Sequence, residues 1–180
     1  MSTFQSRSIV LASCVAIAAL MMPFRAHAQA AKLDDPTIVA IFDAANTWDV
    51  ETGKLAKAKG TTKEIRNFAA MLMHDHTMVR SQGRALAKKL HVTPTPPKDF
   101  GMAKDHAAAM KSLRHQSGKA FDAAFLTHEV AYHKAVIDAM NSTLLPALKN
   151  QEVKDLVTKV APAFKAHEDA AQAMLDKLHK

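Results

Sequence analysis

Cysteine, glycine, proline and aromatic residues are all scarce in this chain of 180 residues. The single cysteine, Cys14, lies in an apolar N-terminal segment, so the rest of the chain can form neither a disulfide nor a thiol-based active site. The sequence has no glycine-rich phosphate loop and no nucleophile elbow. No segment shows the alternating pattern of a strand. Hydrolase, kinase and dehydrogenase activities therefore have no support.

Helix-forming and basic residues are plentiful instead. Hydrophobic residues make up 48% of the chain, enough for one core. Alanine, leucine, lysine and methionine are abundant, which favours helices because unbranched side chains lose little rotamer freedom there. The formal net charge is +7, and the basic residues of the chain are scattered rather than clustered. No groove-reading motif or aromatic stacking platform accompanies them, so we predict a solvated basic face and no nucleic-acid partner.

The first 28 residues are predicted to be a secretory signal peptide. Arg7 supplies the positive charge, residues 8–22 form the apolar region, and small residues precede the expected cleavage point after Ala28. Cleavage after Ala30 is the alternative. Residues 29–180 are then expected to form one exported domain, which is periplasmic if the source is a Gram-negative bacterium.

Two other fates of the leader stay open. Residues 11–14 resemble a lipoprotein box, which would place a lipid on Cys14, and an uncleaved leader would act as an anchor. The apolar run is shorter than the roughly 20 residues that cross a bilayer. No later segment is apolar enough to be a transmembrane span, so the mature chain is expected to be soluble.

Apolar residues recur at helical spacing along most of the mature chain. They predict an all-α fold of four long helices at 35–59, 61–90, 119–145 and 152–178, with a short extra helix at 102–115. Asp35 is the expected cap of the first helix, and Pro162 should kink the last helix or break it in two. Tight turns predict two antiparallel hairpins. The long connection between them permits the crossover of a ferritin-like four-helix bundle.

Each long helix has a polar residue on its predicted apolar stripe. Buried imidazoles and carboxylates need partners, and a shared divalent metal such as Zn, Fe, Mn, Ni or Cu would supply one. The candidate metal ligands are His76, His133, His167, Asp75, Glu51 and Glu129.

The alternative is a set of hydrogen-bonded core residues without a metal. Glu51 fits the metal site least well, because it lies nearer its interhelical turn than His76 does, by roughly 9 Å of helix rise. Four other histidines show no pattern and are expected on the surface: His91, His106, His115 and His179.

Several segments together resemble the exported bacterial family called domain of unknown function 4142. They are DVETGKLA at 49–56, FAAMLMHDHT at 68–77, FDAAF at 121–125, EVAYHKAV at 129–136 and APAFKAH at 161–167. The resemblance implies a ferritin-like helical bundle in the envelope, and it implies no activity. Members are often labelled as membrane or outer-membrane proteins.

Three functions follow from these observations. The first is a metal-binding bundle for storage, sensing or stress protection. The second is a non-catalytic envelope or stress-related protein that binds another protein and has a structural His/acid cluster. The third is a ferritin-like redox enzyme. The third is the weakest, because Glu129 and His133 are four residues apart and the Glu-x-x-His pairs of di-iron bundles are absent.

Overall fold

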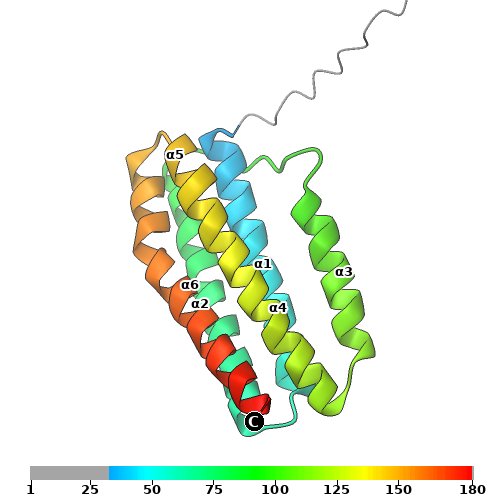
Figure 1. Ribbon diagram of the computed structural model, residues 1–180. Helices are drawn as coiled ribbons and strands as arrows, with labels where there is room; N and C mark the ends of the chain where they lie inside the picture. Colours follow the sequence, from blue (N-terminus) through cyan, green and yellow to red (C-terminus); the bar gives the residue numbers. More distant parts are fainter. Residues whose placement is uncertain (1–32, 180) are drawn as a thin grey trace, which may run out of the picture.

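The computed structural model describes residues 33–179, and these residues form helices with no strand among them (Figure 1). The elements are α1 (Asp35–Lys59), α2 (Lys63–Lys89), α3 (Gly101–His115), α4 (Gly118–Ala139), the π-helical turn η1 (Met140–Leu144), α5 (Leu145–Ala147) and α6 (Gln151–Leu178). The predicted all-α class is confirmed, with five helices of 15 residues or more among the described residues. The predicted leader lies outside them.

The four longest helices lie side by side, and α3 stands apart against one flank (Figure 1). α1 packs along α2, and α4 packs along α6, each pair running antiparallel. The connection between these hairpins contains α3, which returns the chain to the end of the molecule where α2 began. As a result α4 runs in the same direction as α2.

Side chains define the starts of the long helices. Of the two candidate caps of α2, Thr61 and Thr62, it is Thr62 that accepts a hydrogen bond from the Ile65 N–H. The cap of α1 is Asp34, so the prediction of Asp35 is wrong by one residue. The Asp35 carboxylate instead accepts hydrogen bonds from the backbone N–H groups of Lys149 and Asn150, at 2.9 and 3.0 Å. Asp35 therefore joins the start of α1 to the start of α6.

The last two helices differ in detail from the prediction. α6 is a single helix that includes Pro162, so the alternative of two separate pieces is wrong. The helix expected at 119–145 instead changes to π-helical geometry at Met140, and a short turn of α-helix around Pro146 ends it. None of the helices in the described part of the chain combines the length and apolar character needed to cross a bilayer.

The core consists of two apolar clusters separated along the helices. One contains residues from the start of α1 and α6 and the end of α2 and α4, including Phe42, Met140 and Phe164. The other contains residues from the opposite ends, including Leu72 and Phe125. Between them, each of the four long helices places polar side chains in the interior. The middle of the molecule is therefore a buried polar layer.

Candidate metal centre

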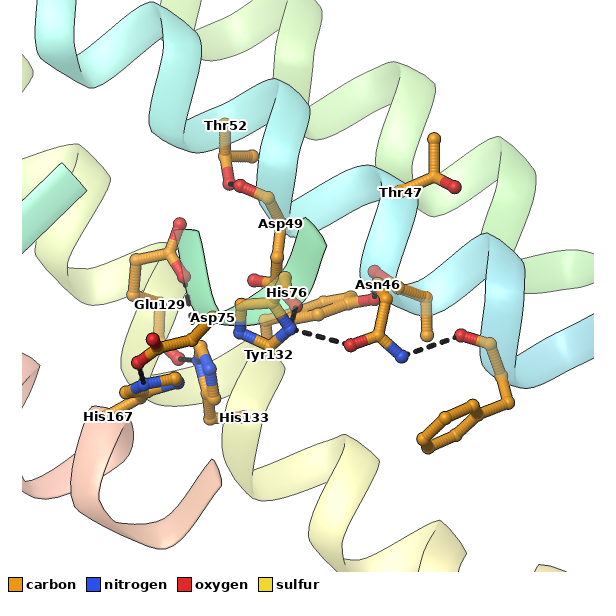
Figure 2. A network of polar contacts seen from close by, with 12 residues as sticks. Asn46, Thr47, Asp49, Thr52, Asp75, His76, Glu129, Tyr132, His133 and His167 are labelled. Atoms are coloured by element: carbon orange, nitrogen blue, oxygen red, sulfur yellow. Dashed lines mark hydrogen bonds and ion pairs between the residues drawn. The ribbon is translucent and has the colours of Figure 1, made fainter. Parts of the chain in front are cut away.

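Three histidines from three helices meet in the polar layer. His76 lies on α2, His133 on α4 and His167 on α6, and they are 1%, 0% and 3% exposed. Their ring centroids are 5.1 to 5.5 Å apart. One ligand atom from each ring can be chosen so that all three lie within 4.8 Å of one another. Figure 2 shows the rings grouped between the helices.

Asn46 holds the His76 ring in one orientation. The Asn46 side-chain N–H donates to the Phe42 carbonyl oxygen at 2.8 Å, which directs the amide oxygen away from that carbonyl. That oxygen lies 2.8 Å from Nδ1 of His76. An amide oxygen can only accept, so Nδ1 of His76 bears the proton. Nε2 then has a free lone pair, and it forms no hydrogen bond.

His133 and His167 are held in the same manner. Nδ1 of His133 donates to the backbone carbonyl of Glu129 at 2.9 Å, and Nε2 of His167 donates to the Asp75 carboxylate at 3.0 Å. The second nitrogen of each ring, Nε2 of His133 and Nδ1 of His167, is buried and has no partner. In proteins, histidines that bind a metal commonly donate their other N–H to a carbonyl or carboxylate in this way.

Two of the three rings, those of His76 and His133, are kept neutral by their burial. Burial, together with the nearby His133 and His167 rings, lowers the pKa of His76 to about 2. Burial lowers the pKa of His133 to about 3, against the opposing effect of its bond to the Glu129 carbonyl. At neutral pH these two rings present lone pairs rather than protons, which is the form that binds metals.

Two carboxyl groups lie beside the histidines. Asp49 of α1 and Glu129 of α4 are 1% and 0% exposed, and none of their four side-chain oxygens forms a hydrogen bond. Asp49 Oδ2 is 3.6 Å from Nδ1 of His76, and Glu129 Oε2 is 3.5 Å from Nδ1 of His133. Burial and the neighbouring Glu129 raise the pKa of Asp49 well above its ordinary value. Burial raises the pKa of Glu129 from 4.5 to about 7.

The raised pKa of Glu129 makes the stability of the metal-free protein depend on pH. The unfolded chain releases this proton near pH 4.5 and the folded chain near pH 7, so Glu129 costs stability increasingly across that window. Glu129→Gln should therefore gain stability relative to wild type as the pH rises from 4.5 to 7, by about 3 kcal/mol at most. Urea unfolding in the presence of a chelator measures the difference, with the exposed Glu64→Gln as control. A difference between wild type and Glu129→Gln that is constant with pH would contradict this assignment.

The other predicted site residues lie in different surroundings. Asp75 lies outside the centre formed by the three histidines; its carboxylate accepts a hydrogen bond from the outer nitrogen of His167, Nε2. Glu51 is 47% exposed and pairs with Nε2 of His106 at 2.9 Å, away from the centre. His106 is buried, so the prediction that it lies on the surface is wrong. It lies on α3 and stacks on the Trp48 ring, with the ring centroids 5.3 Å apart.

The sequence analysis missed Asn46 and Asp49. Both belong to the buried face of α1 that includes Phe42, and they follow Phe42 at spacings of four and then three residues. The apolar residues of this helix, among them Ile41, Ala45 and Trp48, predict a neighbouring stripe that omits both residues. The signal that could have found the two residues is the polar pair at positions 46 and 49, four and seven residues after a phenylalanine.

Comparison with known proteins identifies the family. Residues 21–174 match the family described as Domain of unknown function (DUF4142), and the chain belongs to it. Neither a curated protein nor a solved structure matches the chain.

Proposed function

We propose that this chain is an exported ferritin-like bundle that binds a divalent transition-metal ion through His76, His133 and His167. One observation supports this above all: each ring donates one N–H to a fixed acceptor and keeps its other nitrogen buried without a partner. Three buried acceptors without donors are costly, since each forgoes the hydrogen bond that water would give it. A cation that accepts three lone pairs removes that cost.

The ligand type indicates which metals suit the site. Three neutral imidazoles suit Zn, Cu, Ni and Fe, and a three-histidine set leaves a further coordination position open. The crossover between the two hairpins supports the ferritin-like assignment. The predicted leader supports export to the periplasm. We assign the protein a role in holding a metal, for storage, sensing or stress protection, and no reaction.

Metal uptake by the purified mature protein tests the proposal. Co²⁺ is a suitable probe because its visible bands report on coordination, and elemental analysis gives the stoichiometry of Zn²⁺. We expect wild type to bind both ions and the variant His76→Gln, His133→Gln, His167→Gln to lose Co²⁺ binding by more than 100-fold. The matched control replaces three exposed histidines with glutamine: His74, His115 and His179.

The control should bind Co²⁺ as wild type does. Circular dichroism verifies that each variant is folded, and His133→Gln alone serves if the triple variant is not. Absence of uptake by wild type, or equal uptake by the triple variant, would overturn the proposal. The histidine cluster would then be structural, as expected of a non-catalytic envelope protein with a protein partner.

A further inference from the structure

The carboxyl groups of Asp49 and Glu129 are an unexplained feature of the polar layer. They come from different helices, they are buried, and their four oxygens lack hydrogen bonds. Within residues 33–179, neither group pairs with a lysine or an arginine, and the imidazoles nearest to them, those of His76 and His133, are neutral. The Thr52 hydroxyl is a further polar neighbour of Glu129, and the two carboxyl groups are polar neighbours of each other. Two buried carboxylates without a cation are unfavourable, because each loses its hydration and each repels the other.

These carboxyl groups occupy a position distinct from the three-histidine centre. They face Nδ1 of His76 and Nδ1 of His133, at 3.6 and 3.5 Å. The nitrogens of these rings that are free for the first metal are Nε2, on the other side of each ring. Asp49, Glu129 and His133 also form a group whose ligand atoms lie within 4.8 Å of one another. The two groups share His133, so the two positions are adjacent (Figure 2).

We infer that Asp49 and Glu129 form a second cation position beside the histidine centre, selective for a harder divalent ion such as Mn²⁺ or Fe²⁺. This inference rests on the proposed function, since it makes the metal centre a pair of sites. Two carboxylates balance the charge of one divalent ion. Mn²⁺ prefers oxygen ligands to imidazole nitrogen. Nδ1 of His133 is already bonded to the Glu129 carbonyl, so the carboxylates are the protein ligands of this ion.

The histidine centre and the carboxylate position are expected to differ in selectivity. Zn²⁺ should fill the three-histidine centre first, because imidazole favours the later metals of the first row. Mn²⁺ added to the Zn²⁺-loaded protein should then bind at Asp49 and Glu129. Electron paramagnetic resonance detects this step directly, because the free Mn²⁺ signal falls as the ion is bound.

The decisive variant is Asp49→Asn, Glu129→Gln, which keeps the size of both side chains and removes their charge. We expect wild type to bind about one Zn²⁺ per chain at the three histidines and about one Mn²⁺ per chain at the two carboxylates. The variant should keep Zn²⁺ and bind Mn²⁺ at least 100-fold more weakly. The matched control, Glu64→Gln with Asp169→Asn, removes one exposed glutamate and one exposed aspartate and should bind both ions.

The outcomes separate this inference from the proposed function. Zn²⁺ uptake without any Mn²⁺ uptake, or Mn²⁺ uptake unchanged in Asp49→Asn, Glu129→Gln, overturns the second position and leaves the histidine centre intact. If Asp49 and Glu129 share a proton and bind no cation, the protein takes up Zn²⁺ but no Mn²⁺. Mn²⁺ uptake that depends on Asp49 and Glu129 in a protein that takes no Zn²⁺ supports the carboxylate position and overturns the histidine centre.

Discussion

Replacing Phe164 with alanine is expected to lower the free energy of unfolding by about 3–5 kcal/mol. The Phe164 side chain is 1% exposed and belongs to the apolar cluster at one end of the molecule. Its ring also meets His76 edge to face, with the centroids 5.0 Å apart, and lies 6.0 Å from the His133 ring. Truncation would leave a cavity that the surrounding helices can close only in part.

Urea unfolding of the metal-free protein measures this loss. The control is Met78→Ala on α2, whose side chain is 48% exposed and whose removal should change the stability by no more than about 0.5 kcal/mol. A loss below about 1 kcal/mol for Phe164→Ala would show that the ring does not pack as described. Since Phe164 is one wall of the histidine cluster, the variant should also bind Co²⁺ more weakly than wild type.

Removing the hydrogen-bond acceptors behind two histidines is expected to weaken metal binding strongly while leaving the three ligands in place. Asp75→Ala frees the His167 ring, and Asn46→Leu removes the acceptor for His76 at similar side-chain volume. Each should cost about 10–100-fold in affinity, because these partners fix the tautomer and orientation of the ligating ring. If the two act independently, the double variant loses about 100–10,000-fold.

Competition with a chelator of known affinity measures these changes. The matched control is Asp75→Asn, which keeps an oxygen that can accept from the histidine N–H. It should retain most of the affinity that Asp75→Ala loses. Equal losses in Asp75→Asn and Asp75→Ala would mean that packing, rather than the hydrogen bond, determines the effect.

The helical architecture could be predicted closely because its signals are local. Helical spacing of apolar residues, the Thr62 cap and the glycine after Lys59 locate the ends of α1 and the start of α2. The convergence of His76, His133 and His167 could also be anticipated, since each interrupts an apolar stripe. The π-helical turn at Met140 could not, because no helix-propensity signal in MNSTL distinguishes it from the α-helix that precedes it.

The face of α1 was harder to predict because two of its sides are covered. Trp48 contacts Phe100 and His106 of the α3 region, so its apolar character reports on α3 packing rather than on the central core. The face toward the polar layer contains Asn46 and Asp49, which a count of apolar residues excludes. Hydrophobic periodicity is therefore least informative where a helix buries polar groups on one side and an aromatic residue on another.

The polar layer is also the seam between the two hairpins. The α1–α2 hairpin supplies Asp49 and His76, and the α4–α6 hairpin supplies Glu129, His133 and His167. Contacts within each hairpin are close in sequence and form quickly, whereas docking the hairpins must close the longer segment that contains α3. That docking step buries polar groups that lack partners together with the two apolar clusters, so the metal-free chain gains less stability from it than a purely apolar interface would give. An ion bound across the seam would make two separately forming hairpins unfold as one cooperative unit.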